Sequence, residues 1–418
     1  MKELHVDIAV IGGGPAGLAA AAEAKKLGIE NVLLLERDRE LGGILQQCIH
    51  DGFGIHRFQK RLSGNQYAQA FIDMAIESGV NVKTDTMVLE LTPDRRIFAC
   101  NGLEGMLDIR CGAVILAMGC RERTASQVLI YGDRPAGVLT AGTMQRYINM
   151  EGYLPGEKAV ILGSGDIGLI MARRMTLEGM EVEGVYELMP SPGGLTRNIV
   201  QCLDDYGIPL QLSTTVTAVR GKRRVEGVTV ARVDESRRPV PGTEREIACD
   251  LLVLAVGLIP ENELSQKACI ELDPATKGPL LDDHFMTSVP GIFAAGNVAV
   301  VFDLVDYVSQ SGEAAARGAA LWLKGELPEA PDFVPVEAGE NISFVVPQRI
   351  RKNGNANSAV FYMRVTSPQK TGRLRCEQQG RYILDKPCRY AAPPEMLAVE
   401  AAWEGDGALW FSMSGGES

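Results

Sequence analysis

The chain has 418 residues, of which 46% are hydrophobic and 23% charged, values ordinary for a globular protein of two or three domains. Its formal net charge of −11 argues against nucleic acid and anionic membranes as partners, because both require a basic surface. No apolar run is long enough to span a membrane, so we expect no integral membrane segment. The N-terminal stretch MKELHVDIAV lacks the plan of a signal peptide, which predicts a cytoplasmic location.

The cysteines are scattered along the chain, and none of them forms a CxxC pair. We therefore expect no iron–sulfur cluster, no zinc ribbon and no other metal site. Reduced, buried thiols are the expected state in a reducing compartment.

A glycine-rich turn follows the first apolar run, DIAVI at 7–11, and leads into the helical pattern AGLAAAAEAKKLG. The next strand, NVLLLE, ends in an acid. In such a βαβ unit the first glycine allows the turn, the second lets a pyrophosphate approach, and the third lets helix and strand pack closely. The predicted cofactor-binding residues here are Gly12, Gly14, Pro15, Ala16, Gly17, Glu36 and Arg37.

The same pattern recurs after AVIL at 159–162. Glu187 follows its first glycine by the same number of residues as Glu36 follows Gly12, so the chain contains an internal repeat of a βαβ unit. The alternative is a glycine-rich turn without a ligand. The predicted cofactor-binding residues of this second unit are Gly163, Gly165, Asp166, Ile167, Gly168 and Glu187.

Glu187 favours NAD over NADP. A carboxylate about 5 Å from a 2′-phosphate repels it by about 3 kcal/mol per unit charge at an effective dielectric constant of about 20. An NADP site would instead place an arginine just after the strand, whereas the chain continues as ELMPSPGG and its next arginine is Arg197.

Further segments complete a recognisable order of motifs: GAVILAMGCRER with Gly119, CDLLVLAVGLIPENEL with Gly257, and VPGIFAAGNVAVVFDLVDYVSQSGEAAARGAALWL with Gly296. Over roughly 5–325 the chain resembles the two-dinucleotide flavoprotein disulfide-reductase superfamily. The resemblance implies FAD on the first loop, NAD(P)H on the second, and a return of the chain near Gly296 to complete the flavin site.

The resemblance predicts an α/β fold with two Rossmann-like domains, the NAD domain being inserted in the FAD domain. The expected boundaries are 1–125 and 280–330 for the FAD domain, 126–279 for the NAD domain, and 331–418 for a small β-rich module. Within that module the alternating runs ISFVVPQRI, SAVFYMRVTS, GRYILD, MLAVEAAW and ALWFSMS predict short strands. The module is the expected place for partner docking or self-association, and the sequence does not decide between them.

A narrower resemblance rests on LGGILQQCIHDGFGIH, AGVLTAGTMQRYINMEGYLPG, LGSGDIGLIMARRMTLEG and GNVAVVFDLVDYV. These segments resemble FAD/NAD oxidoreductases that accompany glycerol-3-phosphate-dehydrogenase-like flavoproteins, with related subunits in opine, proline and hydrogen-cyanide-forming dehydrogenases. The resemblance implies an NADH-linked electron-transfer subunit that works with a partner flavoprotein dehydrogenase or as a homo-oligomer.

The flavin site is expected to include Gly42, Gly43 and Asn297. The superfamily usually has Asp at the last of these positions, and Asn keeps an acceptor for a ribityl hydroxyl, although it could instead only cap a turn. The following helix is expected to begin near Asp303 or Asp306, with Asp306 as its N-cap. The resemblance implies that its N-terminus points at the flavin pyrimidine edge, where free N–H groups stabilise reduced flavin.

The two-cysteine pattern of disulfide reductases is absent, since Cys48 stands alone after the glycine pair. Cys48 and His50 are the candidate catalytic residues, with His56 as a further proton donor, and packed or surface side chains are the alternatives. The basic and aromatic segment DGFGIHRFQKRLSG at 51–64 could face an anionic substrate or a partner, or be a solvated loop.

Three functions follow. The first is the NADH-linked flavoprotein subunit. The second is a stand-alone reductase of a thiol, peroxide or oxygen through Cys48. The third is a non-enzymatic sensor or scaffold that binds both cofactors.

Overall fold

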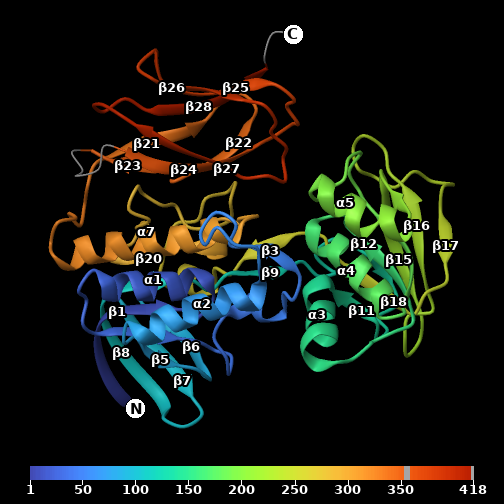
Figure 1. The fold of residues 1–418 in the computed structure, drawn as a ribbon, viewed down its shortest axis with the longest axis horizontal. Helices are drawn as coiled ribbons and strands as arrows, with labels where there is room; N and C mark the ends of the chain where they lie inside the picture. The colour runs from blue at the N-terminus through green and yellow to red at the C-terminus, as the bar shows by residue number, and fades with distance from the viewer. Residues whose placement is uncertain (353–357, 416–418) are drawn as a thin grey trace. The chain divides into compact units, whose positions relative to one another are not determined.

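The computed structural model describes residues 1–352 and 358–415. The chain forms two compact units, one built from Met1–Cys120 and Pro260–Ser418 and the other from Arg121–Ile259 (Figure 1). The second unit is therefore an insertion in the first. The short strands β9 (Cys120–Glu122) and β19 (Leu258–Pro260) pair where the chain passes from one unit to the other and back.

A largely parallel sheet forms the base of the first unit. Strand β1 pairs in parallel with β2 and β8, and β8 also pairs in parallel with β20. The strands, in sheet order, are β5 (Asn81–Lys83), β2 (Val32–Leu35), β1 (Lys2–Ile11), β8 (Gly105–Leu116), β7 (Arg96–Asn101) and β6 (Thr86–Leu91), with β20 (Ile292–Ala294) on β8.

The helices of this unit pack together, since α1 contacts both α2 and α7. Sequence explains their ends: Pro15 occupies the first turn of α1, and Ser63 and Gln66 form a capping box at α2. The remaining elements are α1 (Pro15–Lys26), the 3₁₀ turn η1 (Gly43–Gln47), β3 (Asp51–Phe53), β4 (Leu62–Ser63), α2 (Gly64–Glu77), α6 (Glu263–Lys267), the 3₁₀ turn η4 (Gly296–Val298) and α7 (Val305–Leu323).

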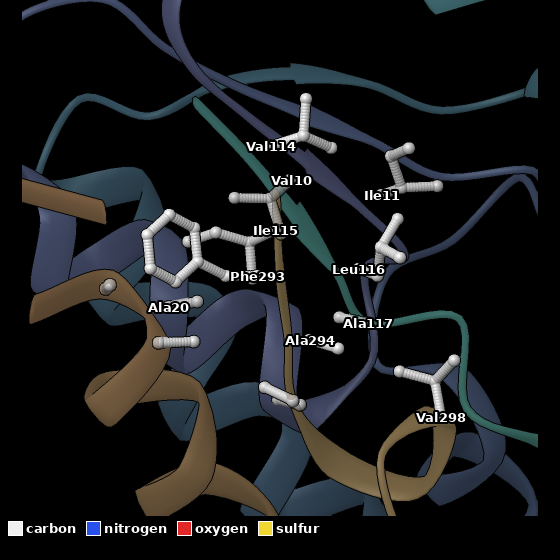
Figure 2. Close-up of a cluster of buried hydrophobic side chains, with 14 of the residues drawn as sticks. Val10, Ile11, Ala20, Val114, Ile115, Leu116, Ala117, Phe293, Ala294 and Val298 are labelled. Atoms are coloured by element: carbon white, nitrogen blue, oxygen red, sulfur yellow. The ribbon is translucent and has the colours of Figure 1, made fainter. Parts of the chain in front are cut away.

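The core of the first unit lies between the sheet and these helices. Val10, Ile115 and Phe293 are register partners on three neighbouring strands, and all three are buried. Figure 2 shows them on the side of the sheet where Ala20 of α1 lies. Because successive residues of a strand point to opposite faces, their neighbour Leu116 points to the other side.

The second unit has a parallel sheet with a separate core on each face. Ile161 packs with the helical residue Met171, whereas its neighbours Val160 and Leu162 pack with Val230 of a second sheet. The parallel sheet runs β11 (Val138–Thr140), β18 (Leu251–Leu254), β12 (Lys158–Leu162), β13 (Glu181–Tyr186), β14 (Leu210–Gln211). The second sheet runs β10 (Tyr131–Gly132), β15 (Thr214–Arg220), β16 (Gly227–Arg232), β17 (Arg245–Ile247). The helical elements are α3 (Ala141–Arg146), the π-helical turn η2 (Tyr147–Glu151), α4 (Asp166–Leu177), α5 (Thr196–Cys202) and the 3₁₀ turn η3 (Asp204–Tyr206).

The C-terminal module, described over residues 331–352 and 358–415, consists of two sheets around their own apolar core. One sheet runs β23 (Arg349–Arg351), β21 (Phe333–Ala338), β28 (Leu409–Gly415), β25 (Gly372–Gln378), β26 (Arg381–Cys388). The other runs β22 (Ile342–Val346), β24 (Ser358–Val365), β27 (Leu397–Ala402). The sequence did not predict β25, whose arginines and glutamate alternate with buried Leu374 and Cys376.

The predicted α/β class, with two Rossmann-like regions and a β-rich C-terminal module, is confirmed. Two expected boundaries differ from the compact units. Residues 121–125, which were expected in the FAD domain, belong to the second unit. Residues 260–279 belong to the first unit, because Ala268 and Ile270 are buried in the same core as β8 and β20.

Candidate functional site

The first glycine loop separates close packing from open surface. A Cβ on Gly12 would lie 2.4 Å from the carbonyl oxygen of Ala117, and one on Gly17 would lie 1.8 Å from that of Gly12. A Cβ on Gly14 would meet nothing within 4 Å. The first and third glycines are therefore required by the protein itself, whereas the second leaves its backbone open to a ligand.

Helix α1 begins directly at this open surface. Gly14 is its N-cap and makes no side-chain capping hydrogen bond, and Pro15 occupies the first helical position. Ala16 lies beneath the return of the chain, because a Cβ on Gly296 would be 2.7 Å from the Ala16 Cβ. The first-turn N–H groups and the helix dipole thus remain available to phosphate.

Glu36 is held against the same loop. Its Oε2 accepts a 2.6 Å hydrogen bond from the Gly13 N–H, and its Oε1 accepts one of 2.8 Å from the Asp38 N–H. The side chain is only 7% exposed, whereas Arg37 is exposed. A carboxylate fixed in this way retains lone pairs for ribose hydroxyls.

The glycine pair Gly42 and Gly43 packs against one side of the first loop. Gly42 donates its N–H to the Gly13 carbonyl at 2.8 Å, and a Cβ on Gly43 would lie 3.1 Å from the Gly14 Cα. Both glycines have positive φ, of 105° and 56°, which favours glycine at these positions.

The second glycine loop repeats this arrangement in the other unit. A Cβ on Gly163 would lie 2.2 Å from the Ala255 carbonyl oxygen, and one on Gly168 would lie 2.6 Å from that of Gly163. Gly165 has nothing within 4 Å of its Cβ position and is the N-cap of α4, without a side-chain capping bond.

Glu187 repeats the role of Glu36. Its Oε2 accepts hydrogen bonds from the N–H and the hydroxyl of Ser164, at 2.9 and 2.6 Å, and its Oε1 accepts one of 2.8 Å from the Met189 N–H. Ser164 is fully buried, and its Oγ also accepts from the Gly193 N–H at 2.9 Å. We did not predict a role for Ser164 from the sequence, although its place between Gly163 and Gly165 of the motif was a usable signal.

The residues that open α4 also hold the neighbouring segment. The Oδ1 of Asp166 accepts from the Leu195 N–H at 2.9 Å and from the Asn198 side-chain amide at 2.7 Å. Ile167 is partly buried against the core of this unit. The side chains of Asp166 and Ile167 thus stabilise the start of α4, a structural role that was not part of the cofactor-binding prediction.

Gly119 and Gly257 follow the ends of β8 and β18 in their respective units. Both have positive φ, of 74° and 100°. Gly119 has nothing within 4 Å of its Cβ position, and Gly257 has only the Arg123 side chain, at 3.9 Å. Both turns therefore expose backbone near the carboxyl end of a parallel strand, the edge at which ligands bind in such sheets.

Asn297 connects the chain's return to the end of β8. Its Oδ1 accepts a 3.0 Å hydrogen bond from the Phe302 N–H, and its Nδ2 lies 3.5 Å from the Cys120 Sγ. The amide thus caps a turn, as the alternative interpretation held, and it does so beside Gly119 of the predicted flavin site.

Helix α7 begins at Val305, between the two expected starting points. The prediction that Asp306 is the N-cap is wrong, because Leu304 occupies that position. The Asp306 Oδ2 instead accepts a 3.2 Å hydrogen bond from the His56 N–H. The local sequence around Asp303 and Asp306 could not predict this hydrogen bond, because its donor lies in the distant segment around His56.

Cys48 is a buried thiol. It is 9% exposed, its Sγ donates to the Ile44 carbonyl at 3.4 Å, and burial raises its pKa to about 12. A thiol protonated at neutral pH is a weak nucleophile, so these features favour the packed alternative. His50 is half-buried with its ring 5.1 Å from that of Phe53, and His56 is exposed.

Arginines of the 51–64 segment are partnered within the first unit. Arg57 pairs with Glu313 of α7 and lies 5.6 Å from the ring centroid of Phe71, and Arg61 pairs with Asp51 at 2.9 Å. Both arginines thus pair with carboxylates of the same unit, which weakens the argument that this segment faces an anionic substrate or a partner.

Residues 1–352 and 358–415 contain no group of three or more His, Cys, Asp or Glu side chains placed to hold a metal ion. No helix in this described part of the chain is both long and apolar enough to cross a membrane.

The two loops fit dinucleotides on structural grounds. Each offers an uncovered second glycine, a helix N-terminus without a side-chain cap, and a buried carboxylate oriented by backbone N–H groups. These are the donors and acceptors that a pyrophosphate and an adenosine ribose require.

Residues 6–318 match the family model for pyridine nucleotide-disulphide oxidoreductases. A glutamate synthase (NADPH) small chain from Azospirillum brasilense is 28% identical, over 80% of this chain and 70% of its own length. A hydrogen cyanide synthase subunit from Pseudomonas protegens is 26% identical, over 69% of this chain and 65% of its own length. An opine oxidase subunit from Agrobacterium tumefaciens is 27% identical, over 77% and 66%. The chain thus spans about two thirds of the length of these relatives.

Two solved structures share the fold. The thioredoxin reductase of T. acidophilum superposes with a TM-score of 0.61 at 23% identity, over 76% of this chain and 98% of that chain. The L-proline dehydrogenase of P. horikoshii superposes with a TM-score of 0.56 at 21% identity, over 79% of this chain and 57% of that chain.

Proposed function

Because this chain belongs to the pyridine nucleotide-disulphide oxidoreductase family, we propose that it passes electrons between NAD(H) and a partner dehydrogenase that oxidises a small metabolite such as glycerol 3-phosphate. The chain is an oxidoreductase whose cofactors are FAD and NAD(P). When bound, these cofactors supply the hydride chemistry, and the protein supplies placement and electrostatics.

The observation that carries the proposal is a repeated arrangement of a glycine loop, a helix N-terminus and a buried glutamate, which we call a cradle. Gly14 and Gly165 each leave open backbone at a helix N-terminus, and Glu36 and Glu187 are held beside them by the same pattern of hydrogen bonds. We assign the first cradle, with Gly42, Gly43, Gly119, Gly296 and Asn297, to FAD. We assign the second, with Gly257, to the nicotinamide nucleotide.

Within this assignment the second cradle prefers NAD. Three hydrogen bonds fix the Glu187 carboxylate, so it cannot swing away from a 2′-phosphate. The segment 188–195 that follows contains no Arg or Lys to neutralise such a group. An NADP-bound state would therefore leave two negative groups close together.

Electron exchange with a partner dehydrogenase is supported by two observations. The chain lacks the CxxxxC pair after Gly43 that is the sequence signature of a redox-active dithiol, and it has no CxxC pair either. Several relatives are named as parts of larger enzymes: of hydrogen cyanide synthase, of opine oxidase and, as the small chain, of glutamate synthase. A glycerol 3-phosphate-like metabolite is the substrate class suggested by the motif resemblance.

The other two functions have less support. A stand-alone reductase working through Cys48 would need a reactive thiolate, and burial raises the pKa of that thiol to about 12. A non-enzymatic sensor does not agree with membership in a family of oxidoreductases.

The decisive experiment is anaerobic mixing of the purified holoprotein with NADH while the visible absorbance of the oxidised flavin is recorded. We expect the bound flavin to bleach within seconds and NADPH to act far more slowly. A preparation that binds no flavin, even after incubation with excess FAD, would refute the proposal.

A second experiment addresses the partner. Tagged protein isolated from its native host should copurify with a flavoprotein dehydrogenase, and addition of that dehydrogenase with its metabolite under anaerobic conditions should reduce NAD⁺. Full turnover with oxygen or a thiol disulfide by the isolated chain, lost in Cys48→Ser, would instead support the stand-alone reductase.

A further inference from the structure

The short segment 299–304, called here the lead-in loop, joins η4 to α7 and is held by the C-terminal module. Arg364 of β24 donates a 3.0 Å hydrogen bond from Nη2 to the Val301 carbonyl. The Met396 N–H donates to the Asp303 Oδ2, also at 3.0 Å. The module thus contacts the loop at two polar points, one on each side of Phe302.

An aromatic cluster lies between these polar points. The ring of Tyr362 meets Phe302 edge-on, with centroids 5.0 Å apart, and meets Tyr307 in the first turn of α7 at 5.6 Å. Its hydroxyl donates to the Gln310 Oε1 at 3.1 Å, and the residue is 1% exposed. Edge-to-face pairs of this kind fix orientation as well as burying area.

Strand β24 explains why one residue can serve two cores. Phe361 and Tyr362 are adjacent, so their side chains point to opposite faces. Phe361 belongs to the core between the module's own sheets, whereas Tyr362 shares a buried cluster with Val300 and Phe302 of the flavin-binding part. The two residues therefore separate the module's own stability from its attachment to the lead-in loop.

The polar contacts are costly, which argues for a positioning task. Burial lowers the pKa of the Arg364 guanidinium and raises that of the Asp303 carboxyl, and the Arg364 Nε is buried without a hydrogen-bond partner among the described residues. Buried charges of this kind contribute little net stability compared with apolar side chains. We therefore infer that the two hydrogen bonds serve to fix the geometry of the loop.

The lead-in loop also contacts a residue of the predicted flavin site. The Phe302 N–H donates to Asn297, and the His56 N–H donates to Asp306 in the first turn of α7. The loop is thus fixed between Asn297 and the module. The family match ends at residue 318, so the module lies outside the matched part of the chain.

We propose that the C-terminal module is a brace that sets the position of the α7 N-terminus at the flavin, with Tyr362 and Arg364 as positioning residues. The inference rests on the proposed flavin site and assigns the module a task within it. The N–H groups of a helix N-terminus stabilise negative charge, so their displacement disfavours reduced flavin more than oxidised flavin.

The test uses the full-length holoprotein and reads out flavin midpoint potential, by equilibration with a redox dye, together with the FAD dissociation constant. In Tyr362→Leu we expect the affinity ratio of reduced to oxidised FAD to fall about tenfold, which makes the potential about 30 mV more negative for a two-electron couple. Phe361→Leu is the matched control, because it removes a neighbouring buried ring from the module's own core. It should lower the unfolding temperature and leave the potential unchanged. Tyr362→Phe keeps the ring contacts and should restore the wild-type potential.

Arg364→Met is the second test variant, and it decides the question if Tyr362→Leu does not fold. It should shift the potential in the same direction. An unchanged potential in the folded test variants, or an equal shift in Phe361→Leu, overturns the brace. A wild-type protein that binds no FAD overturns the proposed function and the brace together, before any variant is compared.

Discussion

Adding one methyl group at Gly165 or at Gly163 should separate nucleotide binding from folding. At Gly165 the backbone has φ −63° and ψ 161°, which any residue adopts, and the new Cβ meets nothing within 4 Å. At Gly163 the backbone has φ +99°, and the Cβ would lie 2.2 Å from the Ala255 carbonyl oxygen. The two substitutions are chemically identical and structurally opposite.

The magnitudes follow from this geometry. Gly165→Ala changes only an N-cap preference, which costs less than about 1 kcal/mol. Gly163→Ala forces an L-residue into a strained backbone region, at about 1–3 kcal/mol, and adds a backbone clash, so we expect a loss above about 3 kcal/mol. Total stabilities are about 5–15 kcal/mol, so the second change should be conspicuous. The methyl of Gly165→Ala occupies the approach of the pyrophosphate and should weaken NADH at least about tenfold, or about 1.4 kcal/mol.

The assay pairs urea unfolding of each variant, without nucleotide, with the NADH concentration dependence of anaerobic flavin reduction. The same contrast should appear for FAD between Gly14→Ala and Gly12→Ala, since a Cβ on Gly14 is unobstructed and one on Gly12 lies 2.4 Å from a carbonyl oxygen. Wild-type NADH affinity in Gly165→Ala would refute the assignment of the second cradle. Equal destabilisation by both variants would refute the geometric reasoning.

Three further outcomes are expected. Glu187→Gln removes the charge that opposes a 2′-phosphate. Because the repulsion is about 3 kcal/mol, the ratio of kcat/KM for NADH to kcat/KM for NADPH should fall about 100-fold. A ratio within about twofold of the wild-type ratio would contradict this prediction. Ser164→Ala deletes the hydroxyl that bonds Glu187 and the Gly193 N–H, and should weaken NADH by about 1–3 kcal/mol without changing FAD content, as measured by titration and absorbance. Burial raises the pKa of Cys48 from 9.0 to about 12, so on raising the pH the thiol ionises in the unfolded chain before it does in the folded protein. The contribution of the protonated Cys48 to folding stability is therefore fully present below pH 9.0 and is lost as the pH rises toward 12. Over this range the unfolding free energy of wild type should fall more steeply than that of Cys48→Ala, by about 1.4 kcal/mol per pH unit, whereas NADH-driven flavin bleaching at neutral pH should be the same in both.

The duplicated cradle could be predicted because its determinants are local. A strand, a turn with glycines at fixed spacing, a helix and a distal acid form a continuous stretch, and Gly12 and Gly163 each belong to such a stretch. In the structure Glu36 and Glu187 bond the backbone residue that follows the first glycine of their own unit. Local chain geometry thus carries the pattern from sequence to site, which is also why the fold class could be predicted.

Where the prediction was incomplete, the determinants are distant in the chain. Asp306 is a residue type that often caps helices, but its carboxylate accepts its hydrogen bond from the N–H of His56, which is 250 residues away in the chain. Strand β25 was not predicted, because its exposed face carries arginine and glutamate and its buried face is recognisable only once β26 and β28 pair with it.

The sequence alone determined that this chain has two glycine-rich βαβ units, their order, and the distal glutamate that belongs to each, because those features depend on neighbours within one unit. Only the tertiary structure decided that Cys48 is buried and that Tyr362 meets Phe302. Burial and ring contacts arise when separate segments are brought together by packing, and no spacing within a single segment encodes them.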